Sequence, residues 1–306
     1  MPPVTVGRVS VDVSGYLRRL GVPEAGGPPD IAALRLLHRA HVERVPYENL
    51  QIALGRPTTV DPAESARRII RGRGGYCYHL NGAFSLLLAT LGYRVSRHVG
   101  GVQGTTADPA GADGKHLALT VSGLPTPENP HGRWFVDVGL GDALHEALPL
   151  VPGGYRQGPF EYGMRPSEAE PGGWRFDHAP GASFLGMDFR PEAVEMAVFA
   201  DNHRWLSTSP ESHFVRTVTV QRRDADGVDL LRGLVLSRIG TTRRREILET
   251  PRDYFTALAD VFGLVLDDVG PAERAALWDR LQADHERRLA EHAEPTGPPQ
   301  AATDSL

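Results

Sequence analysis

Cys77 is the single cysteine of the chain and the residue best suited to nucleophilic chemistry. It lies in RGRGGYCYHLNGAF (71–84), where a Gly-Gly pair allows close approach and an apolar segment follows. We expect the thiol at or near a helix N-terminus, where unpaired N–H groups and the helix dipole favour the thiolate. Arg71 and Arg73 would add to this effect if they point inward. A lone cysteine is commonly just a small buried hydrophobe, so a purely structural role also stays open.

A thiolate that works at neutral pH needs an imidazole base, and the base needs an orienting carboxylate. Among twelve histidines, His116 stands out because it begins the run HLALTV directly after a glycine-rich loop. Asp137 stands out because it lies inside the apolar run RWFVDVGL, where an unpaired carboxylate is costly. A neighbouring imidazole would satisfy that carboxylate. Ordinary roles also stay open, with His116 as a strand-start residue and Asp137 bonded to backbone amides.

The composition limits the classes of function. With 306 residues, 41% of them hydrophobic, the chain can bury a substantial core, and a formal net charge of −5 does not indicate a nucleic-acid partner. The single cysteine excludes an intramolecular disulfide and a thiolate-rich metal site, so we predict no bound metal. Neither a signal-peptide pattern nor a membrane-spanning apolar run is visible. We therefore expect a cytoplasmic protein without a membrane partner.

The first two thirds of the sequence change from helical to β-rich patterns. Apolar residues at helical spacing, with an Asp cap or an early proline, predict helices over 30–45, 62–70 and 81–93. Short β-rich runs separated by Gly and Pro follow and are typical of a small barrel or sandwich. These runs are 94–102, 116–124, 133–140, 159–165, 173–179 and 183–189.

The last third is predicted to be mixed. We expect a helix that runs into a loop, then an antiparallel meander, then two closing helices and a disordered polar tail. The corresponding residues are 191–210, then 213–223, 229–239 and 242–250, then 251–262 and 271–292, then 293–306.

Five stretches of the sequence resemble the arylamine N-acetyltransferases, a family of acetyl-CoA-dependent enzymes with a Cys-His-Asp triad. The cysteine motif together with the upstream PYENL segment is the specific part of this resemblance. The stretches occur in family order: VPYENLQIALGRP (45–57), RGGYCYHLNGAF (73–84), HLALTV (116–121), FVDVGLG (135–141) and NHRWLSTSPESHFVRTVTVQRR (202–223).

The resemblance implies an α+β fold in three parts with a papain-like triad arrangement. An N-terminal helical bundle (1–93) would carry the nucleophile, followed by a central β-barrel (94–205) and a C-terminal α/β lid (206–292), ahead of the tail. By position, Cys77 matches the acylated nucleophile, His116 the base and Asp137 the orienting carboxylate.

The resemblance also implies ping-pong turnover. Acetyl-CoA, or a related acyl-CoA, would be a co-substrate, and no cofactor would be permanently bound. The acceptor would be a small arylamine, hydrazine or hydroxylamine.

Three positions depart from the family pattern. His79 stands where Glu or Gln is usual, Lys115 where Thr or Ser often precedes the catalytic histidine, and Leu140 where Phe is common. We expect Lys115 and Leu140 to border the acyl and acceptor pocket, and Gly141 to bring backbone close to the acyl donor. These three are the predicted donor-binding residues. His79 is expected to alter hydrogen bonding around the triad.

The remaining motifs carry weaker predictions. Tyr47, Glu48 and Asn49 are expected to hold the helical bundle against the triad. Asn81 is expected to act as a local cap or to bond backbone groups. Glycines of the 100–114 loop could approach a CoA pyrophosphate, but ordinary loop geometry explains them equally well because no Walker or dinucleotide spacing is present.

Other functions stay open from the sequence. Leu140 and the Gly/Pro-rich composition are compatible with an amide synthase, which the same family contains, taking a long acyl chain from an acyl carrier protein. A papain-like thiol hydrolase would use a similar triad. A non-catalytic binding protein could also have kept the fold.

Overall fold

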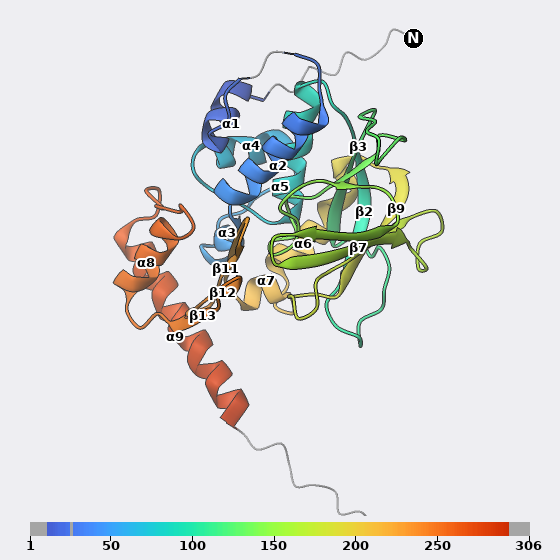
Figure 1. Ribbon diagram of the computed structural model, residues 1–306. Coiled ribbons are helices and arrows are strands. Elements are labelled where there is room, and N and C mark those ends of the chain that lie inside the picture. Colours follow the sequence, from blue (N-terminus) through green and yellow to red (C-terminus); the bar gives the residue numbers. More distant parts are fainter. Residues whose placement is uncertain (1–10, 25–26, 294–306) are drawn as a thin grey trace, which may run out of the picture.

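The computed structural model describes residues 11–24 and 27–293, and its fold is α+β. N-terminal helices, an eight-stranded antiparallel barrel sheet and a C-terminal sheet with helices follow one another along the chain (Figure 1). This confirms the predicted fold class. Apart from residue 293, which ends the last helix, the tail predicted at 293–306 lies outside the described residues. In the part of the chain that is described, no helix is long and apolar enough to cross a bilayer.

Aspartate caps begin three of the N-terminal helices. The side chains of Asp12, Asp30 and Asp61 each accept a hydrogen bond from a backbone N–H in the first turn. The helices are α1 (Val13–Leu20), α2 (Ile31–Arg44), α3 (Leu50–Ala53), α4 (Pro62–Ile70) and α5 (Cys77–Thr90). The helices predicted at 30–45 and 62–70 are confirmed. The third begins at Cys77, four residues earlier than predicted, because Tyr76 rather than a polar cap starts it.

The barrel sheet is antiparallel throughout, with strand order β5-β4-β3-β2-β9-β8-β7-β6. Its strands are β2 (Arg94–Gln103), β3 (His116–Ser122), β4 (Trp134–Val136), β5 (Leu148–Pro149), β6 (Gly153–Gln157), β7 (Phe160–Pro166), β8 (Trp174–Asp177) and β9 (Gly186–Ala193). The strand predicted at 133–140 was too long. It ends at Val136 because the main chain of Asp137 leaves the ladder and bonds a side chain of α2.

The C-terminal sheet has the order β1-β10-β11-β12-β13, so a strand from the N-terminal part pairs at its edge. The strands of this sheet are β1 (Tyr47–Glu48), β10 (Thr219–Asp224), β11 (Gly227–Arg232), β12 (Val235–Gly240) and β13 (Arg244–Ile247). The helices of this part of the chain are η1 (Met196–Phe199), α6 (Ala200–Thr208), α7 (His213–Arg216), α8 (Pro251–Asp260) and α9 (Pro271–Ala293). In Figure 1, α8 lies on the side of this sheet away from the barrel.

Three predictions in this region were wrong in detail. The helix expected from 191 starts at Met196, because β9 continues to Ala193. The strand expected over 213–223 opens with a short helix that the Ser212 side chain caps. The strand expected over 229–239 is a hairpin, because Gly233 has a positive φ of 58° and turns the chain between β11 and β12.

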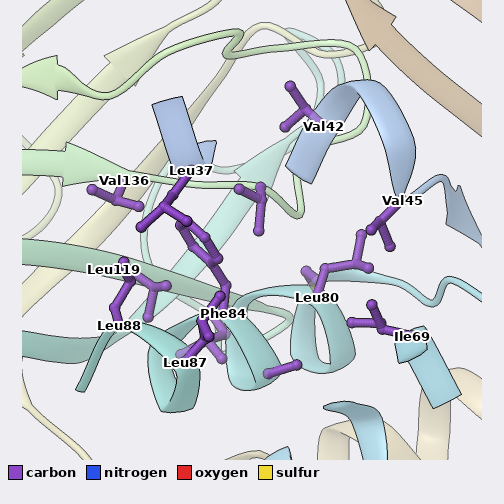
Figure 2. Close-up of a cluster of buried hydrophobic side chains, with 14 of the residues drawn as sticks. Leu37, Val42, Val45, Ile69, Leu80, Phe84, Leu87, Leu88, Leu119 and Val136 are labelled. Atoms are coloured by element: carbon purple, nitrogen blue, oxygen red, sulfur yellow. The ribbon is translucent and has the colours of Figure 1, made fainter. Parts of the chain in front are cut away.

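A shared core holds α5 between the other helices and two barrel strands (Figure 2). Burial of each large apolar side chain contributes about 2 kcal/mol, so this contact fixes the helix that begins at Cys77 against the strands that lead to the other triad positions. The contributing residues labelled in the figure include Leu80, Phe84 and Leu87 of α5, Leu37 of α2, Ile69 of α4, Leu119 of β3 and Val136 of β4.

Candidate active site

Cys77 is the first residue of α5, as its sequence context predicted. Its side chain is buried, at 3% exposure, and Sγ lies 3.7 Å from the carbonyl oxygen of Lys115. The start of a helix presents unpaired N–H groups, which favour negative charge on a sulfur at this position. The residue after Lys115 is His116, so the backbone contact brings the thiol to the start of β3.

His116 and Asp137 form a buried ion pair. The Nε2 atom of His116 lies 2.7 Å from Oδ2 of Asp137, and the two residues are 2% and 1% exposed. They come from neighbouring strands, since β3 pairs with β4 and Asp137 directly follows β4. Because Nε2 faces the carboxylate, Nδ1 is the nitrogen left to interact with the Cys77 thiol.

The surroundings of His116 favour its protonated form. Burial lowers the pKa of the imidazole, but the charge and hydrogen bond of Asp137, helped by a hydrogen bond with Cys77, outweigh burial and raise that pKa to about 10. The imidazole therefore carries a proton at neutral pH. This arrangement can hold a cysteine thiolate beside an imidazolium without a metal.

Asn81 fixes the other oxygen of the carboxylate, a role that the sequence prediction missed. Its Nδ2 donates to Asp137 Oδ1 at 2.7 Å and to the carbonyl of Leu117 at 2.6 Å, and its Oδ1 accepts from the N–H of Val138 at 2.9 Å. We expected Asn81 to cap the helix locally or to bond backbone groups, and the backbone groups that it bonds are far away in the sequence. Its spacing could have indicated a role at the site, because Asn81 lies four residues after Cys77 on the same face of α5.

Gly139 brings the loop after β4 against the start of α5. A Cβ at this position would lie 2.7 Å from Cα of Cys77, closer than any side chain tolerates. The N–H of Gly139 also donates to Asp137 Oδ1 at 2.9 Å. The missing side chain therefore lets the carboxylate-bearing loop lie directly on the nucleophile's backbone.

Leu140 and Gly141, two of the predicted donor-binding residues, lie together. They line a cavity of about 10 Å³ beside the triad, with Tyr47, Asp137, Gln221 and Arg223 among the other lining residues. Gly141 has a positive φ of 71°, and a Cβ there would lie 1.7 Å from Oε1 of Gln221. The buried amide of Gln221 and the backbone conformation thus explain why glycine occupies this position.

Lys115 lies elsewhere around the nucleophile. Its side chain is about half exposed, Nζ pairs with Asp113 Oδ2 at 2.7 Å, and the ammonium lies 5.7 Å from the ring centre of Trp205. It is the carbonyl of Lys115, rather than its amine, that contacts Cys77. The three predicted donor-binding residues are therefore not brought into one group.

The PYENL segment ties two parts of the chain to the bundle, and only the bonds of Glu48 lie close to Cys77, whereas those of Asn49 lead to the C-terminal sheet. Glu48 accepts hydrogen bonds from the N–H groups of Leu50 at 2.6 Å and Gly74 at 3.2 Å, which ties β1 to the approach to Cys77. Asn49 bonds three backbone groups near the start of β10, namely the carbonyls of Phe214 and Thr217 and the N–H of Thr219.

Three further sequence features have local explanations. Arg71 is exposed and does not meet the condition of pointing inward, whereas Arg73 is buried and its Nη1 lies 3.5 Å from Oδ1 of Asp268. His79 accepts the N–H of Tyr76 at 3.4 Å and so caps the first turn of α5, and burial holds its pKa well below the ordinary value. Gly101 packs so closely that a Cβ would lie 2.2 Å from the carbonyl of Gly111, which favours the loop-geometry explanation.

Comparison with known proteins gives consistent matches over most of the chain. A family model described as N-acetyltransferase matches residues 30–270. The arylamine N-acetyltransferase of Mycolicibacterium smegmatis is 31% identical over 278 residues, covering 85% of this chain and 94% of that protein. The Mycobacterium tuberculosis enzyme of the same name is 29% identical over 287 residues, covering 89% and 95%.

Solved structures agree with the sequence matches. The arylamine N-acetyltransferase of Mycobacterium marinum superposes with a TM-score of 0.78 at 27% identity, covering 89% of this chain and 99% of that one. A structure of the M. marinum enzyme in complex with CoA gives the same TM-score at 26% identity and the same coverage. Because sequence and architecture match over nearly the whole described fold, this chain belongs to the arylamine N-acetyltransferase family of enzymes.

Proposed function

We propose that this enzyme transfers an acetyl group from CoA, by way of a thioester on Cys77, to the nitrogen of an arylamine, hydrazine or hydroxylamine. The observation that carries the proposal is the buried chain of contacts from the Cys77 thiol through His116 to Asp137. The binding of CoA by the M. marinum relative supports CoA as the donor.

In the first half-reaction the Cys77 proton resides on Nδ1 of His116, and the resulting imidazolium is stabilised by Asp137. The thiolate attacks the carbonyl carbon of acetyl-CoA, a C–S bond to Cys77 forms, and the C–S bond to CoA breaks. The departing CoA thiolate takes the proton from His116. The products of this half are free CoA, acetylated Cys77 and a neutral imidazole.

In the second half-reaction the amine nitrogen attacks the carbonyl of the Cys77 thioester. Neutral His116 accepts the amine proton, the C–N bond forms and the C–S bond to Cys77 breaks. The amide leaves, and the thiolate and imidazolium are restored. Asp137 keeps one orientation of the ring through both halves, so the same nitrogen gives and receives the proton.

The site favours a short acyl group. The cavity beside the triad is about 10 Å³, and Leu140 packs into the barrel core with Leu144 and Leu148 instead of opening a channel. A long polyketide-type chain on a carrier protein would need a larger space than these contacts leave.

The test is mass spectrometry of the intact protein after incubation with acetyl-CoA, with longer acyl-CoA thioesters and with an acyl carrier-protein thioester. We expect a gain of one acetyl group, located on Cys77, that disappears when an arylamine is added and N-acetylated product appears. Cys77→Ala should gain nothing. Acylation by the carrier-protein thioester alone would replace this proposal with the amide-synthase function.

A further inference from the structure

The imidazole of His38, on α2, spans both ends of the loop that follows β4. The loop between β4 and β5 covers residues 137–147, and its part from Asp137 to His145, the 137–145 loop, includes Leu140 and Gly141. Nδ1 of His38 lies 3.1 Å from the carbonyl oxygen of His145, and Nε2 lies 3.1 Å from the carbonyl oxygen and 3.3 Å from the nitrogen of Asp137. The His38 side chain is fully buried. A single ring therefore closes the loop at the residue that carries the triad carboxylate.

The protonation state of His38 follows from these contacts. Burial lowers the pKa of this imidazole to about 4, so the ring is neutral at physiological pH and carries one proton. With that proton on Nδ1, the ring donates to the His145 carbonyl and Nε2 accepts the N–H of Asp137, so both nitrogens are satisfied. The other tautomer would donate from Nε2 to the Asp137 carbonyl, but it would leave the Nδ1 lone pair against the His145 oxygen and the Asp137 N–H without an acceptor, so it satisfies one contact instead of two. We assign the Nδ1–H tautomer on this ground.

Other α2 side chains hold only the far end of the same loop. Nη1 of Arg39 lies 2.6 Å from Oε1 of Glu146, and Oε1 of Glu43 lies 2.7 Å from Nε2 of His145. Of these α2 contacts, the one made by His38 is the one that reaches Asp137. Loss of His38 would leave the end at His145 anchored and release the end that carries the carboxylate.

We propose that His38 is a positioning residue for the triad: by bonding the backbone at both ends of the 137–145 loop, it keeps the Asp137 carboxylate aimed at His116. This inference rests on the proposed function, because it assigns His38 a part in maintaining the thiolate–imidazolium pair. His38 does not contact the reacting atoms, and it acts through the backbone of Asp137.

His41 provides a matched control on the same helix. It is also fully buried, burial also lowers its pKa, and its ring also packs edge-on against Phe84. Its Nε2, however, lies 3.0 Å from the hydroxyl of Tyr16 on α1, and none of its bonds reaches the 137–145 loop. A general loss of packing in α2 would affect both positions, whereas a positioning role belongs to His38 alone.

The experiment measures the pH dependence of Cys77 alkylation by iodoacetamide, together with kcat, KM for acetyl-CoA and the unfolding temperature. The variants are His38→Ala, His38→Gln, His38→Asn and His41→Ala. A Gln carboxamide reaches the Nε2 position toward Asp137, and an Asn carboxamide reaches the Nδ1 position toward His145. The two variants therefore separate the two ends of the loop even if His38→Ala does not fold.

For His38→Ala we expect the alkylation midpoint to rise by about one pH unit, which corresponds to about tenfold less thiolate at low pH, and kcat to fall about tenfold or more with KM little changed. His38→Gln should restore more of the wild-type profile than His38→Asn. His41→Ala should lose stability but keep the wild-type midpoint. A wild-type midpoint in folded His38→Ala, or equal profiles for the Gln and Asn variants, would overturn the inference while leaving the proposed function intact. If wild-type Cys77 is itself alkylated only above pH 8, both proposals fall.

Discussion

Asp137 sets the protonation state of His116. A carboxylate at 1% exposure is costly to bury, but this one accepts hydrogen bonds from Asn81, from the N–H of Gly139 and from His116. These partners hold the carboxylate in one orientation, and its negative charge outweighs the burial that disfavours an imidazolium at His116. The reactivity proposed for Cys77 is thus set two side chains away from the sulfur.

The raised pKa of His116 predicts a specific pH dependence of stability. In Cys77→Ala, where Asp137 still raises this pKa but the contribution of Cys77 is gone, folded His116 keeps a proton that the unfolded chain loses above pH 6.5. The stabilisation is fully present below that pH and is lost as the pH rises through the folded pKa of the variant, which lies below the value of about 10 in the intact enzyme. Each pH unit in this window should cost about 1.4 kcal/mol of unfolding free energy.

Urea denaturation of Cys77→Ala at several pH values from 6 to 9.5 measures this effect. The double variant Cys77→Ala/Asp137→Asn is the control, because it lacks the charge that raises the pKa of His116. We expect a clearly smaller loss of unfolding free energy in the double variant over the same pH range. Equal slopes would show that Asp137 does not hold the proton on His116.

At the scale of elements, the site depends on the contact between the start of α5 and the loop after β4. Gly139 allows this contact because its Cα faces the backbone of Cys77. Asn81 of α5 strengthens this contact by hydrogen-bonding Leu117 in β3 and Val138 in the loop after β4. Cys77 and Asp137 therefore come from different elements that pack directly against each other.

Gly139→Ala should separate these two elements. The added Cβ would meet Cα of Cys77 at 2.7 Å, and backbone cannot rotate away as a flexible side chain can. We expect a loss of about 1–3 kcal/mol of stability from overpacking and at least a hundredfold loss of acetyl transfer from misplacement of the triad. Denaturation curves and steady-state rates measure the two effects.

Gly154→Ala is the matched control, since a Cβ at this position in β6 meets nothing within 4 Å and the backbone does not require glycine. It should keep wild-type stability and rate. A Gly139→Ala enzyme as active as this control would contradict the close contact.

At the scale of the whole molecule, the three parts meet at the site. The helical bundle supplies Cys77, the barrel sheet supplies His116 and the loop with Asp137, and the C-terminal sheet contributes Gln221 and Arg223 to the wall of the neighbouring cavity. The C-terminal sheet is joined to the bundle through β1, where Tyr47 pairs with Gln221. Asn49 supports this joint at the edge of the sheet.

Asn49→Ala should weaken the joint between the bundle and the C-terminal sheet. It removes hydrogen bonds at 3.0, 2.8 and 2.8 Å from the buried carbonyl of Phe214 and from the partly buried carbonyl of Thr217 and N–H of Thr219. We expect about 3 kcal/mol of lost stability, the usual consequence of unsatisfied buried polar groups, and a lower acetyl-transfer rate. Asn202→Ala, whose single bond to Asp113 is 3.5 Å long and exposed, should change neither quantity. Equal unfolding temperatures for the two variants would contradict the role of Asn49.

The sequence by itself singled out the three candidate triad positions, because each stands out from its neighbours in a way that chemistry explains. Cys77 is unique and precedes an apolar helix, His116 follows a glycine-rich loop, and Asp137 is an acid inside an apolar strand. The same local patterns determined the fold class and the helices at 30–45 and 62–70. Such features depend on residues close together in the chain, so they can be recognised from the sequence alone.

Only the tertiary structure decided which side chains hold the triad in place. His38 looks like an ordinary helix residue in the sequence and Asn81 shows only its spacing from Cys77, yet they bond Asp137 from 99 and 56 positions away. The separation of Lys115 from Leu140 was likewise decided by contacts between distant segments. Long-range pairing depends on how the helices and sheets pack, and no short stretch of sequence records that packing.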